Sequence, residues 1–169
     1  MSVFIAYGSN LLSGPVTASQ AFGEVVKNLQ ARRLIVNKIS RLWSSKAWPN
    51  PDDPPYVNAV LQITTDFQPI ELMALLHDLE REAGRMRDGR LNAPRVLDLD
   101  LIAYGDVVTR GEKGLIVPHP RAADRAFVMG PLAEIAPDWI HPVLQRTATE
   151  LLTAATIGTD AYPLAATAS

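Results

Sequence analysis

The sequence predicts an α+β fold in which two helices cover one face of an antiparallel sheet. Short apolar segments of strand length alternate with two longer stretches whose apolar residues recur with the period of an α-helix, and turn residues separate them. Their order along the chain is strand, helix, strand, strand, helix, strand. That order is typical of a ferredoxin-like βαββαβ sandwich, whose second sheet face is then open for a ligand.

The first half of the chain accounts for one helix and three strands. Residues 3–7 form a short apolar strand that runs into a turn at 8–10, where small side chains can hydrogen-bond the backbone. Apolar residues between 18 and 29 keep a helical period and predict the first helix. Residues 34–43 and 56–65 predict the next two strands.

A proline-rich loop separates these two strands. Residues 44–55 contain Pro49, Pro51, Pro54 and Pro55, a density that excludes regular structure and stiffens the backbone. We therefore expect this loop to stand at the surface.

The second half of the unit begins at Pro69, which is suited to the first turn of a helix. An apolar stripe carries this helix to Gly84, and residues 97–104 predict the last strand of the unit. The C-terminal additions comprise a short helix near 121–131 and a helical stretch around 147–155. Residues 158–169 are small and polar, and we expect them to form a flexible tail.

Length and composition limit the classes of function. At 169 residues the chain fits one domain, which we assign to residues 1–157. The absence of cysteine excludes disulfides and thiolate chemistry and favours a cytoplasmic location. No basic start precedes a long apolar run, and the net charge of −2 disfavours nucleic-acid binding. We expect a soluble monomer without a nucleic-acid or membrane partner.

Charged residues concentrate between residues 85 and 101. Four arginines lie between residues 85 and 95, directly before Asp98 and Asp100. Leu97, Leu99 and Leu101 alternate with the aspartates, so a strand would bury the leucines and present both carboxylates on the opposite face. Paired carboxylates beside arginines favour magnesium that is held together with phosphate oxygens.

Each half of this segment also has a structural interpretation. A single Asp-x-Asp pattern is common, and a strand with a solvated polar face explains it about equally well. The arginines could form a solvated loop with salt bridges to Asp88 and Glu82. Because Gly84 and Gly89 make the segment flexible, the arginines could instead close over a triphosphate as a lid.

Five segments taken together are more specific. They are Gly8-Ser9-Asn10-Leu11, Pro55-Tyr56-Val57-Asn58-Ala59, Glu80 followed by Gly84-Arg85-x-Arg87, Pro94-Arg95-x-Leu97-Asp98-Leu99-Asp100, and Val117-Pro118-His119. In this order, between about residues 3 and 142, they resemble the 6-hydroxymethyl-7,8-dihydropterin pyrophosphokinases of folate biosynthesis. The resemblance implies the ferredoxin-like fold and transfer of the β,γ-pyrophosphate of ATP to the hydroxymethyl group of the pterin, with release of AMP.

The resemblance also implies roles for individual residues. The catalytic set would be Asp98, Asp100, Arg85 and Arg95, with two magnesium ions bound by Asp98 and Asp100 and bridging the phosphates of ATP. The positions that match ATP contacts are Glu80, Arg87, Arg95, His119 and Arg125. The pterin would lie between the rings of Tyr56 and Phe127, and the remaining pterin positions are Asn58, Ser45 and Trp48.

Two segments depart from the family pattern. Residues 91–95 read Leu-Asn-Ala-Pro-Arg where the family usually reads Arg-Trp-Gly-Pro-Arg, so a tryptophan that helps to seal the closed site is absent. Residues 44–48 replace a stretch that is usually Thr-Pro-x-Gly-like. The first departure leaves open an alternative function, a catalytically weakened paralogue that binds nucleotide or pterin. An RNA-binding domain that uses the open sheet is disfavoured by the acidic pair and the negative net charge.

Overall fold

The computed structural model describes residues 1–10, 15–47, 50–85 and 97–165. The strands are β1 (Val3–Asn10), β2 (Ile35–Ile39), β3 (Trp43–Ser45), β4 (Tyr56–Thr64), β5 (Asp98–Tyr104) and β6 (Tyr162–Pro163). The helices are α1 (Pro15–Ala31), α2 (Pro69–Arg85), α3 (Ala126–Ile135) and α4 (Ala148–Ala154). Short 3-10 turns lie at Glu112–Gly114 and Ala122–Asp124.

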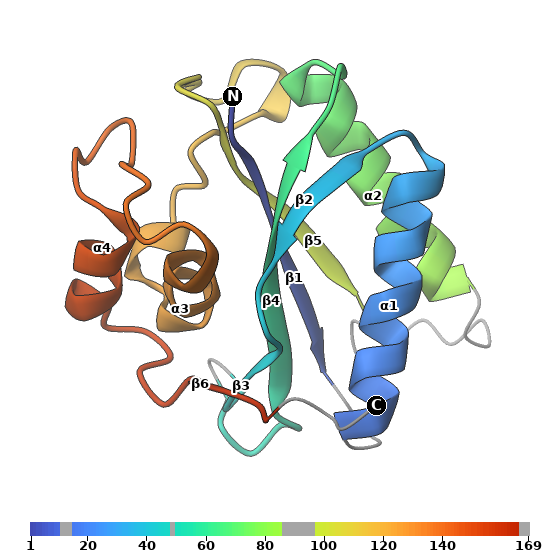
Figure 1. Cartoon of the computed structure of the whole chain (residues 1–169), viewed down its shortest axis with the longest axis vertical. Helices are drawn as coiled ribbons and strands as arrows, with labels where there is room; N and C mark the ends of the chain where they lie inside the picture. The colour runs from blue at the N-terminus through green and yellow to red at the C-terminus, as the bar shows by residue number, and fades with distance from the viewer. Residues whose placement is uncertain (11–14, 48–49, 86–96, 166–169) are drawn as a thin grey trace.

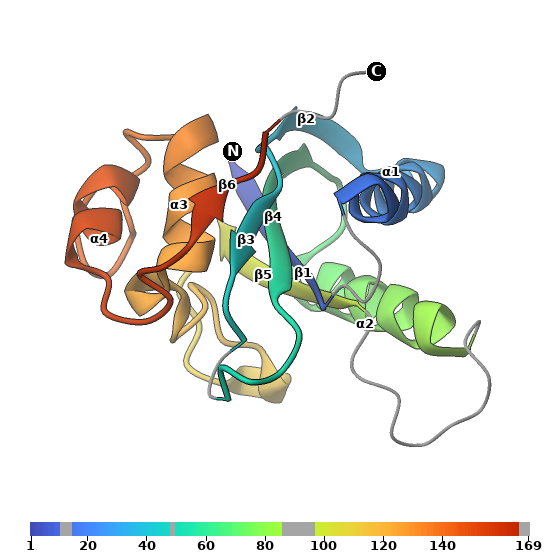
Figure 2. The same cartoon turned by 90° about the horizontal axis from the view of Figure 1, so that it is seen from below.

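The strands form one antiparallel sheet in the order β5-β1-β4-β3-β6, and β2 also pairs with β4. Helices α1 and α2 lie on one face of this sheet, as the sequence predicts (Figure 1). The α+β fold with its βαββαβ unit is therefore confirmed. The prediction that the second face is open was incomplete, because α3 packs on that face and α4 packs against α3 (Figure 2).

Two hydrophobic cores lie on the two faces because successive strand side chains point in opposite directions. The core beneath α1 and α2 includes Ile5, Tyr7, Leu61, Leu99 and Leu101 from the strands and Leu29, Leu72 and Leu76 from the helices. The core beneath α3 and α4 includes Phe4, Ala6, Val60 and Ile102 from the strands and Met129, Leu132 and Leu151 from the helices. The second core covers only part of its sheet face, and this leaves room for a cavity.

The strand predicted at 34–43 is divided into β2 and β3, both of which pair with β4. Ser40 lies between them, and its hydroxyl accepts the backbone N–H of Val60 at 2.9 Å. The backbone N–H of Ser40 donates to the Val60 carbonyl at 3.0 Å. The Ser40 hydroxyl therefore takes the place of a backbone carbonyl in the hydrogen-bond ladder with β4. This interruption divides the predicted single strand into β2 and β3.

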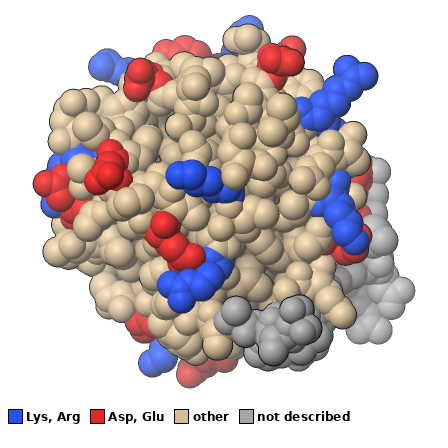
Figure 3. Space-filling model, in the orientation of Figure 1, with Lys and Arg blue, Asp and Glu red and all other residues tan. Residues whose placement is uncertain are grey.

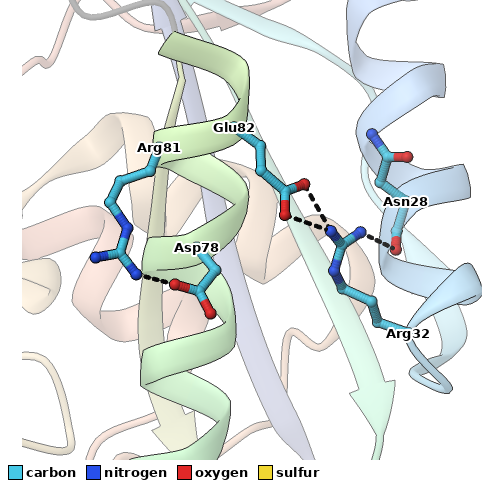
Figure 4. A network of polar contacts seen from close by, with 5 residues as sticks. All are labelled: Asn28, Arg32, Asp78, Arg81 and Glu82. Atoms are coloured by element: carbon cyan, nitrogen blue, oxygen red, sulfur yellow. Dashed lines mark hydrogen bonds and ion pairs between the residues drawn. The ribbon is translucent and has the colours of Figure 1, made fainter. Parts of the chain in front are cut away.

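Helices α1 and α2 are joined at one end by an exposed ion pair (Figure 4). Nη2 of Arg32, directly after α1, lies 2.8 and 2.6 Å from the two carboxylate oxygens of Glu82 on α2. A second pair, Arg81 with Asp78, lies within α2. Both pairs are largely exposed, so each contributes roughly 0–1 kcal/mol, and the buried leucines contribute more to the helix packing.

Acidic and basic side chains are interspersed over the face of the molecule seen in Figure 3. Among the described residues on that face, no patch of a single sign dominates. Among the described helices, none is both long and apolar enough to cross a membrane.

The C-terminal additions differ from the prediction in two places. Helix α3 continues through Pro131 to Ile135, because Met129 and Leu132 are fully buried on either side of the proline and offset the backbone hydrogen bond that proline cannot donate. Residues 162 and 163, within the predicted tail, form β6 and pair with β3. Helix α4 lies where a helical stretch was predicted, and Thr147 caps it with Glu150 in a capping box.

Gly130 is required where α3 packs on β3. A Cβ at Gly130 would lie 2.6 Å from Cζ3 of Trp43, whose Nε1 donates to Glu134 at 2.9 Å and restrains the ring. We predict that Gly130→Ala lowers the free energy of unfolding by about 1–3 kcal/mol, measured by urea denaturation. The matched control is Gly23→Ala on α1, where a Cβ meets nothing within 4 Å and the change should stabilise by roughly 0.5–1 kcal/mol. Equal stabilities of the two variants would contradict this packing.

Candidate active site

A cavity of about 300 Å³ opens on the sheet face that α3 and α4 cover only in part. Its floor comes from β1, β4 and β5, and its opposite wall comes from the start of α3. It brings together seven of the predicted site residues, which are Ser45, Tyr56, Asn58, Asp98, Asp100, Arg125 and Phe127. Four parts of the chain that are distant in sequence therefore meet at one site.

The register of the sheet aligns the floor of this cavity. Gly8 on β1 pairs with Asn58 on one side and with Asp98 on the other. Two residues away, Ala6 pairs with Asp100 on β5. Residues two apart on a strand share a face, so the amide of Asn58 and both carboxylates point to the same side of the sheet.

Small residues on β1 make room for a ligand. A Cβ at Gly8 would lie 3.8 Å from Oδ1 of Asn58 and 3.8 Å from Cβ of Asp98. Gly8 and Ala6 both line the cavity, and neither carries a side chain long enough to fill it. The space between the amide and the carboxylates therefore exists because β1 has small residues at these two positions.

The alternation predicted for β5 is confirmed. Leu99 and Leu101 are 2% and 6% exposed and belong to the core beneath α1 and α2. Asp98 is half-buried and Asp100 is exposed, and both line the cavity on the opposite face. Among the described residues no three His, Cys, Asp or Glu side chains are grouped to hold a metal ion, so the two aspartates do not form a closed metal cage by themselves.

Glu80 connects α2 to β5 close to the two aspartates. Its Oε1 accepts the backbone N–H of Leu99 at 2.6 Å. Burial raises the pKa of Glu80, and the negative charges of Asp98 and Asp100 act in the same direction. The hydrogen bond from Leu99 opposes this shift of the pKa but does not cancel it. Glu80 does not line the cavity, and its contact orients the strand that carries the aspartates.

His119 lies near Asp100, and its pKa is lowered from the ordinary value for histidine. Burial lowers its pKa, against the opposing effect of the Asp100 charge, and Arg125 and Arg121 lower it further. Its Nδ1 accepts the backbone N–H of Arg121 at 3.2 Å, which leaves Nε2 as the ring nitrogen that can donate. The backbone N–H of His119 donates to the carbonyl of Ile102 on β5 at 2.8 Å. His119 therefore offers a hydrogen-bond donor near the end of the sheet, outside the cavity lining.

Arg125 and Phe127 form the wall of the cavity on the α3 side. The guanidinium carbon of Arg125 lies 5.8 Å from the centre of the Phe127 ring, which is a cation–π distance. Nε of Arg125 is buried and has no hydrogen-bond partner in the described part of the chain. A buried donor of this kind favours an anionic ligand, because leaving it unpaired costs about 1–3 kcal/mol.

A buried hydrogen bond joins the cavity floor at β4 to the end of β3. Nδ2 of Asn58 donates to Oγ of Ser45 at 3.0 Å, and the two residues are 6% and 3% exposed. The bond sets which way the Asn58 amide faces. Tyr56 lies two residues before Asn58 on the same face of β4, so its ring and the amide border the same space.

Some predicted site residues fall elsewhere. Arg87, Arg95 and Trp48 lie outside the described residues, and Arg85 is the last residue of α2 with a side chain that is also outside them. Lys46, Val128 and Ala6 line the cavity but were not predicted as site residues. Lys46 directly follows Ser45, a predicted pterin contact. This neighbourhood was the one feature of the sequence that could have indicated Lys46 as a site residue.

The sequence matches the family model described as 7,8-dihydro-6-hydroxymethylpterin-pyrophosphokinase over residues 4–137. A relative from Haemophilus influenzae named 2-amino-4-hydroxy-6-hydroxymethyldihydropteridine pyrophosphokinase is 38% identical over 142 residues, which cover 84% of this chain and 86% of that protein. A protein of the same name from Pseudomonas aeruginosa is 38% identical over 136 residues, covering 80% and 81%. Folic acid synthesis protein fol1 of Pneumocystis carinii is 34% identical over 142 residues, which cover 84% of this chain and 18% of that longer protein.

The raised pKa of Glu80 predicts a pH-dependent effect of Glu80→Gln on stability. The folded protein keeps the Glu80 proton to higher pH than the unfolded chain, so ionisation of Glu80 lowers the free energy of unfolding as pH rises above 4.5. Glutamine retains an oxygen that can accept the Leu99 N–H but carries no charge. The variant should therefore gain stability relative to the wild type as pH rises, measured by urea denaturation without divalent cations. A difference that stays constant from about pH 4 to about pH 8 would contradict this prediction.

Proposed function

The chain belongs to the 7,8-dihydro-6-hydroxymethylpterin-pyrophosphokinase family, and on that premise we propose that it transfers the β,γ-pyrophosphate of ATP to the hydroxymethyl group of 6-hydroxymethyl-7,8-dihydropterin. AMP is the second product. The observation that carries the proposal is the row formed by Asn58, Gly8 and Asp98 across three strands, which places an amide suited to a heterocycle edge next to carboxylates suited to a metal–phosphate group. The site for ATP, the pyrophosphate donor, and the site for the pterin, the acceptor, are thus adjacent in one cavity.

The acceptor lies against β4 and α3 in this proposal. A flat pterin ring stacks between Tyr56 and Phe127, which contribute to opposite walls of the cavity. Asn58 hydrogen-bonds the ring edge through the groups of its amide that Ser45 does not engage. Trp48, outside the described residues, keeps the pterin contact that the resemblance implies.

The residues present fit magnesium that is shared with phosphate oxygens. Magnesium is usually bound through one or two carboxylates together with phosphates and waters. Asp98 and Asp100 supply two carboxylates on one face, and the described residues add no third acidic ligand to them. Two bound magnesium ions would neutralise the phosphate charge that develops during transfer. Asp98 and Asp100 would hold these ions, and a bound cation would relieve the repulsion between the two carboxylates.

In this proposal, the ATP-binding residues that lie in the described part of the chain are close to the two carboxylates. Arg125 donates from its guanidinium to phosphate oxygens, and His119 donates from Nε2. Glu80, which lies outside the cavity lining and accepts the Leu99 N–H, keeps the ATP contact that the resemblance implies. Arg85, Arg87 and Arg95 retain the phosphate-binding roles that the resemblance implies.

The chain promotes the reaction by positioning. The acceptor hydroxyl oxygen forms a bond to the β-phosphorus of ATP, the bond from that phosphorus to the oxygen bridging to the α-phosphate breaks, and the hydroxyl proton leaves to solvent. Asn58 and the two rings hold the hydroxymethyl group over Asp98 and Asp100, so both reactants are in place before the bond forms. No covalent nucleophile is required, in agreement with a chain that has no cysteine. We propose a monomer that acts in the cytoplasm.

The proposal predicts release of AMP when the protein is incubated with ATP, magnesium and the reduced pterin. Chromatography of the nucleotides separates AMP from ADP, and omission of the pterin is the control. AMP that appears only with the acceptor supports pyrophosphoryl transfer. ADP in its place, or binding of ATP and pterin by calorimetry with no AMP, would contradict the proposal.

The carboxylates are expected to be essential for turnover. Asp98→Asn and Asp100→Asn preserve side-chain shape and remove the charge that binds the cation, so each should lower kcat by about 100-fold or more. Asp106→Asn, at an exposed aspartate two residues after β5, is the matched control and should remain active. Circular dichroism checks that the fold is retained. Near-normal turnover of both site variants would contradict the metal-binding role.

Asn58 is expected to act on the acceptor more than on ATP. Asn58→Ala removes an amide that is buried at the cavity floor, so the KM for the pterin should rise about tenfold or more while the KM for ATP changes little. Asn28→Ala, on the exposed side of α1, serves as the control. An equal rise in both KM values would contradict an acceptor-binding role for Asn58.

A further inference from the structure

Residues 156–164 form a segment that crosses from α3 to β3, beyond the end of the family match at residue 137. After α4 the chain runs past the start of α3 and adds β6 to the edge of β3 (Figures 1 and 2). The start of α3 and the end of β3 both line the cavity, through Phe127 and Ser45. This segment, which we term the C-terminal strap, therefore contacts both of these parts of the lining.

The strap first binds the start of α3. The backbone N–H of Ala126 donates to the Ile157 carbonyl at 2.8 Å, and the Ile157 N–H donates to the Asp124 carbonyl at 3.0 Å. The backbone N–H of Thr156 donates to the Asp124 carboxylate at 2.8 Å. Arg125, between these contacts, pairs with Ile157 as an isolated parallel bridge. These bonds fix the backbone directly before Phe127.

Gly158 then packs against the ring of Phe127. Its φ of +67° lies in the left-handed region, which a side chain makes unfavourable. A Cβ at Gly158 would overlap the Phe127 ring and would lie 3.0 Å from Cε1. Glycine therefore allows the strap to support this ring from outside the cavity.

Asp160 binds the chain at the end of β3. Its carboxylate accepts the backbone N–H of Lys46 at 2.7 Å, one residue after Ser45. Beyond it, β6 pairs with β3, and the Leu164 N–H donates to the Leu42 carbonyl at 2.7 Å. The strap thus holds the strand that carries Ser45 and, through the Ser45 hydroxyl, the orientation of Asn58.

We propose that the C-terminal strap sets the spacing between the two walls of the acceptor slot, with Gly158 and Asp160 as positioning residues. This inference rests on the proposed function, because it concerns the slot that holds the pterin. A flat ring stacked between two aromatic side chains loses contact when either side chain moves by a fraction of an ångström. Asp98 and Asp100 are held by the β1–β5 pairing, whereas in the described part of the chain β6 pairs with β3, so loss of the strap weakens acceptor binding selectively.

The role of Asp160 is tested by steady-state kinetics. Asp160→Ala should raise the KM for the pterin about threefold to tenfold, while the KM for ATP and kcat change less than about twofold. Asp160→Asn keeps an acceptor oxygen for the Lys46 N–H and should restore the KM for the pterin. Asp138→Ala, at an exposed position in the same C-terminal region, is the matched control and should leave both KM values unchanged.

The role of Gly158 is tested by a pair of glycine variants. Gly158→Ala and Gly114→Ala both place a side chain at positive φ, +67° and +78°, but a Cβ at Gly114 meets nothing within 4 Å. Both variants should lose a similar amount of stability from backbone strain. Only Gly158→Ala, which displaces Phe127, should raise the KM for the pterin.

Two kinetic outcomes would overturn the inference. One is a KM for the pterin that stays normal in both Asp160→Ala and Gly158→Ala. The other is a parallel rise in both KM values, which would indicate general damage to the fold.

If the wild type released no AMP, the proposed function would fail, and calorimetry of the same variants with the pterin alone would decide the inference. Reduced affinity in these variants supports it, whereas unchanged affinity, or no binding by the wild type, overturns it.

Discussion

The pairing of β1 between β4 and β5 is the constraint on which the candidate site depends. It places Gly8 opposite both Asn58 and Asp98, and Ala6 opposite Asp100. Because side chains alternate along a strand, a slip of one residue would turn the Asn58 amide or the two carboxylates toward the core beneath α1 and α2. The same slip would bring core leucines to the cavity floor. The register is therefore specified by core packing, and the site inherits its geometry from that packing.

The charges of the site are arranged around this sheet from both faces. Glu80 approaches from α2 and bonds the Leu99 backbone, so three carboxylates surround a short stretch of β5. On the other face, the half-buried side chain of Arg125, directly before α3, supplies positive charge. Repulsion among the carboxylates and the unpaired Nε of Arg125 are both relieved by a cation bound together with an anion. A metal–polyphosphate complex has that combination of charges.

The second sheet face serves two purposes because α3 and α4 cover only part of it. The covered part buries Phe4, Val60 and Ile102 and contributes to stability. The uncovered part becomes the cavity, whose wall is the first turn of α3. The C-terminal strap binds the backbone at this first helical turn and also pairs with β3. The walls of the acceptor slot are thus tied to one another by a segment that does not line the cavity.

The sequence by itself determined the βαββαβ order, the leucine–aspartate alternation of β5 and the residue types of the site, because each depends on periodicity or on a short motif. The tertiary structure decided the features that depend on contacts between distant segments. Ser40 interrupts the predicted 34–43 strand only because its hydroxyl meets Val60, and α3 covers the second face only because its apolar residues find Phe4 and Ile102 there. Residues 162 and 163 carry little apolar pattern of their own, and they form a strand because β3 offers a free edge.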